Sequence, residues 1–168
     1  MLSRRRFVGG SALAAAALST PLGAQGAKEV LIGALYPLSG AAAQIGVDAK
    51  TAFETAIEVI NGAHPDIDLP MAKGSGLAGL GGAKIRLVYA DHQSDPQKGR
   101  SEAERLITQE KVSAIIGSYQ SSVAATISQT CERYGVPFIA ADNSSPSLHR
   151  RGLKYFFRPA AHDEMFSI

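Results

Sequence analysis

The chain has 168 residues, 45% of them apolar, which is enough for one domain with a hydrophobic core. Without Arg4, Arg5 and Arg6, which lie in a predicted export signal, 14 of the 17 Lys and Arg residues remain against 15 Asp and Glu, so the mature net charge is near −1. This balance excludes a basic nucleic-acid-binding face. The single cysteine, Cys131, excludes an internal disulfide framework and is predicted to pack as a small apolar residue.

Residues 1–26 predict an export signal, because a basic start is followed by an apolar stretch and then by small residues. Residues 3–8 resemble the twin-arginine signal, with Gly9 where lysine is usual. The apolar run is rich in Ala, Gly and Ser and is shorter than the roughly 20 residues of a membrane-spanning helix. We therefore expect cleavage near Ala24 or Gly26 and a periplasmic location.

Beyond the signal, short β-rich runs alternate with segments of helical period, which predicts βα units and a mostly parallel sheet. The fold class is therefore α/β, a Rossmann-like sheet flanked by helices. The expected strands span residues 29–35, 84–90, 112–117, 136–141 and 153–158.

Three helices are expected between these strands. The first ends at an Asn-Gly pair, and the second begins at Pro96 under an Asp95 cap. The third begins near Ser121 or Ser122 and ends at Gly135. The first should bury one stripe, formed by Ala49, Phe53, Ala56, Ile57 and Ile60. The third should bury another, formed by Val123, Ile127, Cys131 and Tyr134.

Residues 62–83 are rich in Gly and Pro and have neither period, so we expect a long loop insertion there. Within it, residues 74–79 satisfy the pattern G-x-G-x-x-G. They precede a strand, whereas the dinucleotide fingerprint follows a strand and opens a helix, so no cofactor is predicted. The four histidines also lack metal-ligand spacing, so no metal site is predicted; they are His64, His92, His149 and His162.

Polar turns follow the first four strands. Ligands of open α/β sheets bind at the carboxyl ends of strands, where helix N-termini stabilise anionic groups. These turns therefore predict a site for a small polar ligand with an anionic group. They read "YPLSGAAAQIG", "DHQSD", "GSYQSS" and "DNSSPS".

An enzyme hypothesis makes Ser121 or Ser122 a nucleophile, with His92 and either Asp91 or Asp142 as partners. The turn "GSYQSS" lacks the second glycine of the hydrolase elbow Gly-x-Ser-x-Gly, which weakens this alternative. A serine at the start of the third helix is more often an N-cap, which is the structural interpretation of Ser121.

Four segments in order carry a resemblance to a known family: "IGALYPLSGAAAQIG", "YADHQSDPQKG", "IIGSYQSSVAA" and "VPFIAADNSSPSLHRRGLKYFFR". Over residues 28–168 the chain resembles the periplasmic solute-binding proteins of ABC transporters, of the branched-chain amino acid (Leu/Ile/Val-type) receptor family. The resemblance implies the type I periplasmic-binding-protein fold, in which two α/β lobes close on a ligand. Residues 27–161 would form the first lobe only, and residues 162–168 would begin a helix and the crossover to a second lobe.

The resemblance also implies a ligand site. In the family the first lobe holds an α-carboxylate and an α-ammonium group through a serine after the third strand and polar groups after the fourth. Ile45 stands where an aromatic residue often covers the ligand, and the turn "ADNSS" stands where leucine receptors have Ala-Ala-Thr. The implied ligand-binding residues are Ser121, Ser122, Asp142, Asn143, Ser144, Ile45 and Tyr119.

The resemblance therefore predicts a monomeric, non-enzymatic solute-binding protein without cofactors. It would deliver an amino acid, an amide or an aromatic acid to a membrane ABC permease. The alternatives are the secreted serine hydrolase and a ligand-sensing domain of a receptor, which shares the fold.

Overall fold

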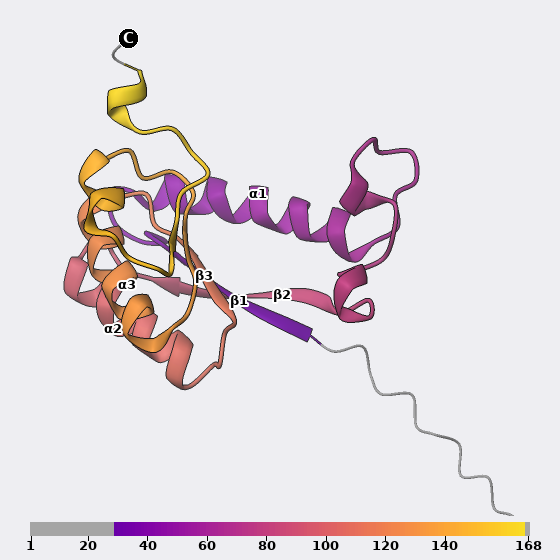
Figure 1. Cartoon of the computed structure of the whole chain (residues 1–168), viewed down its shortest axis with the longest axis horizontal. Helices are drawn as coiled ribbons and strands as arrows, with labels where there is room; N and C mark the ends of the chain where they lie inside the picture. Colours follow the sequence, from indigo (N-terminus) through magenta and orange to yellow (C-terminus); the bar gives the residue numbers. More distant parts are fainter. Residues whose placement is uncertain (1–28, 167–168) are drawn as a thin grey trace, which may run out of the picture.

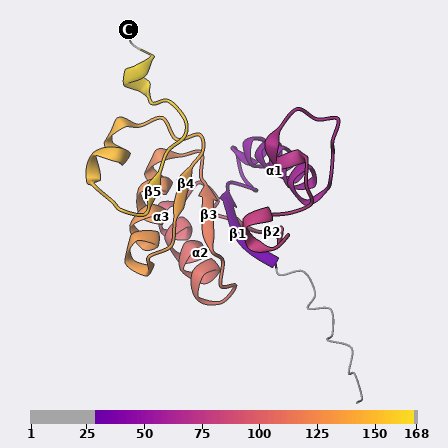
Figure 2. The same ribbon diagram turned by 45° about the vertical axis from the view of Figure 1, so that its right-hand side comes forward.

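The computed structural model describes residues 29–166, so the predicted export signal lies outside the described residues. Five parallel strands form one sheet in the order β2-β1-β3-β4-β5. The strands are β1 (Glu29–Tyr36), β2 (Lys84–Asp91), β3 (Ala114–Gly117), β4 (Phe138–Ala140) and β5 (Phe156–Phe157). This order confirms the predicted α/β fold class, and Figure 2 shows the strands side by side.

Three helices flank the sheet: α1 (Ala43–Asn61), α2 (Pro96–Thr108) and α3 (Ser121–Tyr134). Helix α1 covers the face of β1 and β2 on one side, whereas α2 and α3 pack together on the other side (Figures 1 and 2). Among the described residues, 29–166, no helix has both the length and the apolar character needed to cross a bilayer.

The helix ends confirm two predictions and contradict a third. Asp95 caps α2 by accepting a hydrogen bond from the Lys98 N–H at 2.7 Å. Gly135 ends α3 in the left-handed conformation, with φ of 68°. The N-cap of α3 is Gln120, so Ser121 is the first helical residue and the interpretation of Ser121 as a cap was wrong.

The hydrophobic core lies between the sheet and the α2–α3 layer. Its fully buried members include Leu35, Leu106, Ile115, Ile127 and Phe138. Cys131 packs there as predicted, and burial raises the pKa of its thiol to about 12.

Two predicted core positions were wrong. Tyr134 is 40% exposed because it lies in the last turn of α3, where its hydroxyl donates to Glu104 Oε1 at 2.6 Å on the surface. Ala56 is also exposed, whereas the other members of the α1 stripe are half-buried. Helix α1 contacts β2, the 3-10 turn at Pro70–Ala72 and β1, and its buried stripe is narrower than the sequence pattern suggests.

Residues 62–83 form the expected excursion, with two short 3-10 turns at Pro70–Ala72 and Ala78–Leu80. Ala72 is fully buried, and Leu77 pairs with Ala83 in an isolated bridge. Gly76 has φ of 73°, and a Cβ atom there would lie 2.5 Å from the Gly82 carbonyl oxygen. The Gly-rich stretch therefore makes a tight local turn and opens no α-helix.

The last part of the chain differs from expectation. Residues Pro146–Arg151 form a 3-10 helix, η3, where only a loop was predicted. The predicted final helix is represented by one short 3-10 turn, η4, at Asp163–Met165. This last segment rises away from the sheet in Figure 1.

Candidate functional site

The turns after β1, β2, β3 and β4 lie along one edge of the sheet, because all strands run in the same direction. In Figure 1 β1 and β2 run toward the left, which places their carboxyl ends there. Side-chain hydrogen bonds join the turns across long stretches of sequence: Tyr36 OH donates to Asp142, and Gln120 Nε2 donates to Ser94 Oγ at 2.7 Å. The four polar turns therefore form one connected surface, as the sequence predicts.

Asp91 ties the turn after β1 to the turn after β2. Its carboxylate accepts from the Leu38 N–H at 2.8 Å, the Gln93 N–H at 2.8 Å and the Ser39 hydroxyl at 2.5 Å. Burial opposes ionisation of this carboxyl group, but the three hydrogen bonds outweigh it and lower the pKa of Asp91. Asp91 therefore holds the turns in place as a charged acceptor.

His92 is fully buried behind this edge, and both of its ring nitrogens are occupied. The Ser94 N–H donates to Nδ1 at 3.0 Å, so Nδ1 is an acceptor and the proton of the neutral ring lies on Nε2. Nε2 then donates to the Ser118 carbonyl oxygen at 2.9 Å. Burial also lowers the pKa of His92, which favours this neutral form. His92 therefore has no free nitrogen to act as the general base of a hydrolase.

Asn143 holds the turn after β3 from the opposite side. Its Oδ1 accepts from the Ser118 N–H at 3.2 Å, and its Nδ2 donates to the Tyr119 carbonyl oxygen at 2.9 Å. The side chain is fully buried. Both ends of the amide bind backbone, so the geometry gives the Asn143 side chain a positioning role.

Asp142, beside Asn143 in the turn after β4, is an acidic acceptor on the exposed side of the turn after β3. Its Oδ1 accepts from the Tyr119 N–H at 3.0 Å and from the Tyr36 hydroxyl at 3.3 Å. Surrounding atoms keep water from the carboxyl group and raise the pKa of Asp142, although the residue as a whole is exposed. Burial, followed by the nearby Asp142 charge, raises the pKa of Tyr36 far above its usual value.

The N-terminus of α3 opens directly onto this surface. No side chain caps the helix, and no acidic residue lies in its first turn. The first N–H groups of an α-helix have no partner inside the helix, and together they favour an anion. Ser121 Oγ accepts from the Ser145 N–H at 3.3 Å, whereas Ser122 is exposed. Two hydroxyl groups thus lie beside the free helix end.

The remaining predicted residues lie around this centre. Tyr119 is 41% exposed and has φ of 73°, and Ser144 is exposed and donates to Asp163 Oδ2 at 3.2 Å. Ile45 is half-buried in the first turn of α1, on the other face of the sheet from α3. The ligand-contacting role of the seven residues stays a prediction.

The predicted polar turns contain Tyr36, Ser39 and Ser118, but sequence reasoning did not single out these residues. Tyr36 is the last residue of β1, and Ser118 directly follows β3. Their positions at strand ends were a usable signal, because such residues face the turns of neighbouring strands. The bonds that they form depend on the arrangement of strands in space.

Concave surfaces also lie elsewhere in the described part of the chain. One groove of about 510 Å³ lies between α2 and α3, and another of about 410 Å³ lies beside His162. Within residues 29–166, no group of three or more His, Cys, Asp or Glu side chains is placed to hold a metal ion. The carboxyl edge is an open polar surface.

The comparisons with known proteins identify the family. The model of the periplasmic binding protein family matches residues 29–166, so the chain belongs to this family. It is 36% identical over 154 residues to Leu/Ile/Val-binding protein homolog 7 of Brucella abortus, and 30% identical over 135 residues to homolog 3 of Brucella melitensis. These alignments cover 90% and 80% of this chain but 35% and 33% of the relatives. The chain thus spans about a third of the length of the curated relatives it matches.

Solved structures agree on the fold. The substrate-binding protein LivJ of Streptococcus pneumoniae, solved with isoleucine, has a TM-score of 0.66 and 25% identity; the match covers 81% of this chain and 35% of that one. A solute-binding protein of Rhodopseudomonas palustris, solved with 3,4-dihydroxybenzoic acid, has a TM-score of 0.64 and 20% identity, over 80% and 32% of the two chains. These matches confirm the type I periplasmic-binding-protein fold, and their coverage fits the single predicted lobe.

Proposed function

We propose that the protein is an extracytoplasmic solute-binding protein that delivers an amino acid or a related small polar solute to an ABC-type importer. In this proposal residues 1–26 direct export and are removed, and residues 27–161 form the first ligand-binding lobe. Residues 162–168 lead toward a second lobe, and the receptor acts as a monomer. Membership of the periplasmic binding protein family supports the proposal.

The observation that carries the proposal is the uncapped N-terminus of α3 beside an acidic side chain. The free N–H groups of the first turn suit the carboxylate of a ligand. Asp142 lies close by, because its Oδ1 accepts from the N–H of Tyr119, two residues before the helix begins. An anion-binding helix end next to a carboxylate fits a zwitterion, whose ammonium group pairs with Asp142.

This charge pattern bears on the choice between ligand classes. The similar structures include one solved with isoleucine and one solved with an aromatic acid. An aromatic acid leaves Asp142 without a cationic partner and places a second negative charge near it, which is unfavourable at short range. We therefore favour an α-amino acid over an aromatic acid.

The hydrolase alternative is disfavoured by the state of His92. A serine nucleophile needs a neighbouring base with a free nitrogen. Both nitrogens of His92 are hydrogen-bonded to backbone groups of Ser94 and Ser118. The other groups of the proposed site can bind and orient a small ligand, which is what a receptor requires. A receptor needs no activated base.

A ligand screen on the full-length protein tests the proposal. We expect L-leucine, L-isoleucine or another amino acid to raise the melting temperature, because a ligand at about 100 times its Kd adds roughly 2.7 kcal/mol of stability. Each amino acid is paired with its deaminated carboxylic acid, which keeps the carboxylate and side chain but lacks the ammonium group. The carboxylic acids should give smaller shifts. If no amino acid, amide, urea or aromatic acid shifts the melting temperature, the proposal fails.

A further inference from the structure

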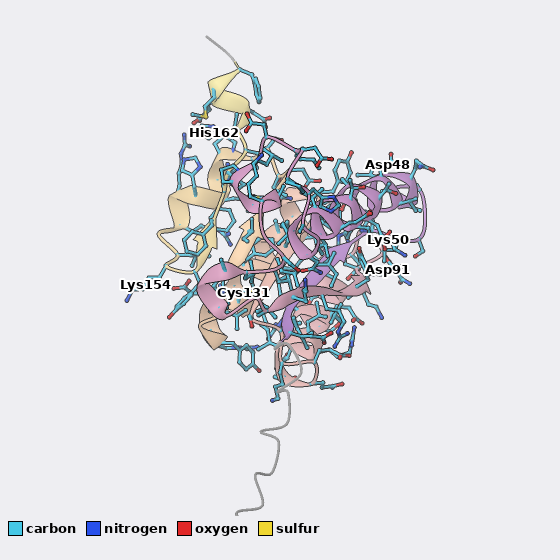
Figure 3. All side chains as sticks on the ribbon, turned by 90° about the vertical axis from the view of Figure 1, so that its right-hand side faces the viewer. Asp48, Lys50, Asp91, Cys131, Lys154 and His162 are labelled. Atoms are coloured by element: carbon cyan, nitrogen blue, oxygen red, sulfur yellow. The ribbon has the colours of Figure 1, made fainter. Side chains whose placement is uncertain are left out.

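The segment after β5 contacts the turn after β4, which carries three of the predicted ligand-binding residues. Asp163 opens η4, and its backbone N–H donates to the Ser144 carbonyl oxygen at 3.0 Å. The Ser144 hydroxyl donates in turn to Asp163 Oδ2 at 3.2 Å. Figure 3 labels His162, the residue before Asp163, on the yellow last segment. Two residues that lie 19 positions apart in the sequence thus exchange two hydrogen bonds.

A second contact from the same segment fixes this turn. Arg158, which follows β5, donates through Nη2 to the Ser145 carbonyl oxygen at 2.6 Å. Hydrogen bonds from an ionised donor are among the strong ones in proteins. The backbone is therefore held at both Ser144 and Ser145. Rotation of the Ser144 hydroxyl proton is the freedom that remains, and the carboxylate of Asp163 restricts it.

The contact with Asp163 determines how the Ser144 hydroxyl can meet a ligand. An ionised carboxylate only accepts hydrogen bonds, so the hydroxyl proton must point toward Asp163. The hydroxyl oxygen keeps its lone pairs and presents an acceptor to a ligand at this turn. Asp142, two residues earlier, is an acceptor as well. Both groups therefore suit an ammonium group, which has only donors.

Ser121, on the other side of the proposed site, has the opposite polarity. Its Oγ accepts from the Ser145 N–H at 3.3 Å, and within residues 29–166 its own proton makes no hydrogen bond. The proton can thus donate to a ligand, beside the free N–H groups of α3 that suit a carboxylate. The site therefore has a donor side at α3 and an acceptor side at the turn after β4.

We propose that Asp163 is a specificity-determining residue of the solute site and that it acts through Ser144. By orienting the Ser144 hydroxyl as an acceptor, Asp163 makes the site favour a ligand with an ammonium group over the same ligand without one. Asp163 does not need to touch the solute, so it is a positioning residue. The inference rests on the proposed solute-binding function and adds a selectivity element outside the four polar turns.

The test compares the affinities of an amino acid and of its deaminated carboxylic acid. Calorimetric titration of the full-length protein uses an L-amino acid that the native protein binds, L-leucine first, and the matching acid, which is isocaproic acid for leucine. Asp163→Ala should weaken binding of the amino acid about three- to tenfold, the range of a typical net hydrogen bond, and should not weaken binding of the acid. Ser144→Ala should have the same effect. Asp66→Ala, in the 62–83 loop, is the matched control and should bind both ligands like the native protein.

A double variant separates an effect through Ser144 from a direct effect of the Asp163 charge. Once residue 144 is alanine, Asp163→Ala should not change the preference for the amino acid any further. A further loss of preference in the double variant would overturn the inference. So would an equal loss of affinity for both ligands in Asp163→Ala, because a merely structural role weakens both alike.

Circular dichroism establishes that each variant is folded. Should Asp163→Ala fail to fold, Ser144→Ala decides the matter, since an unchanged preference in that variant refutes the role of the oriented hydroxyl. The result for the native protein keeps the two proposals apart. Absence of amino-acid binding by the native protein contradicts the proposed function itself, whereas intact binding with an unchanged preference in Asp163→Ala contradicts only the role of Asp163.

Discussion

The imidazole Nε2 of His92 lies 2.9 Å from the carbonyl oxygen of Ser118, a residue 26 positions further along the chain. This contact joins the turn after β2 to the turn after β3, three residues before α3 begins. The Ser94 N–H fixes the ring from the other side. The position of the α3 N-terminus thus depends on a buried, neutral histidine that does not need to touch the ligand.

Replacement of His92 by phenylalanine should destabilise the protein and weaken ligand binding together. The change keeps an aromatic ring but leaves the Ser118 carbonyl and the Ser94 N–H without partners in a buried place, at a cost of about 1–3 kcal/mol each. Urea unfolding gives the free energy of unfolding, and calorimetry gives the affinity. His64→Phe, in the 62–83 loop, is the control. If His92→Phe unfolds at the same urea midpoint as the native protein, the His92 hydrogen bonds do not stabilise the fold.

His92 should also make stability depend on pH. Burial lowers the pKa of His92 in the folded protein below its usual value of 6.5. The unfolded chain therefore binds the proton more readily, and stability is lost as pH falls from about 6.5 through the folded pKa. Urea midpoints measured from about pH 7.5 down to pH 5 should fall for the native protein and fall less for His92→Phe. If the urea midpoints of the native protein and of His92→Phe fall equally with pH, His92 does not cause the pH dependence of stability.

The strands and the meeting of the four polar turns at one edge were predictable, because apolar spacing indicates the strands and parallel strands place their carboxyl ends along the same edge. The different roles of adjacent residues in one turn were not predictable from the sequence. Asp142 and Asn143 are adjacent polar residues in one turn, yet Asn143 is fully buried and binds the backbone around Ser118, whereas Asp142 is exposed. The direction of each side chain depends on how the turn after β4 passes the turn after β3, which no local pattern encodes.

The end of α3 illustrates the same limit. The stripe that contains Cys131 correctly predicts its buried face, but the helical period also includes Tyr134 in that face. Whether the last turn of a helix still lies over the core depends on where its packing partners end. Tyr134 instead reaches Glu104 of α2 at the surface.

Replacement of Ser121 by alanine should weaken solute binding by about 1–3 kcal/mol, the cost of an unmet polar partner. Its hydroxyl lies at the free end of α3 and also accepts from the Ser145 N–H, so the turn after β4 should loosen as well. Calorimetry on the full-length protein measures the affinity. Ser101→Ala, on the surface of α2, serves as the control. Equal affinities for Ser121→Ala and the native protein would remove Ser121 from the site.

Replacement of Gly46 by alanine should be strongly destabilising, although alanine is the better helix former by about 1 kcal/mol. Gly46 is buried in the first turn of α1, and a Cβ atom there would lie 2.1 Å from the Pro37 carbonyl oxygen. Because the obstacle is backbone, α1 or the turn after β1 must move. That turn also supplies the Leu38 N–H and the Ser39 hydroxyl that Asp91 binds.

Gly79→Ala, where a Cβ atom meets nothing within 4 Å, is the control. We expect a lower melting temperature and weaker solute binding for Gly46→Ala only. An unchanged melting temperature would mean that α1 does not pack on Pro37 as described.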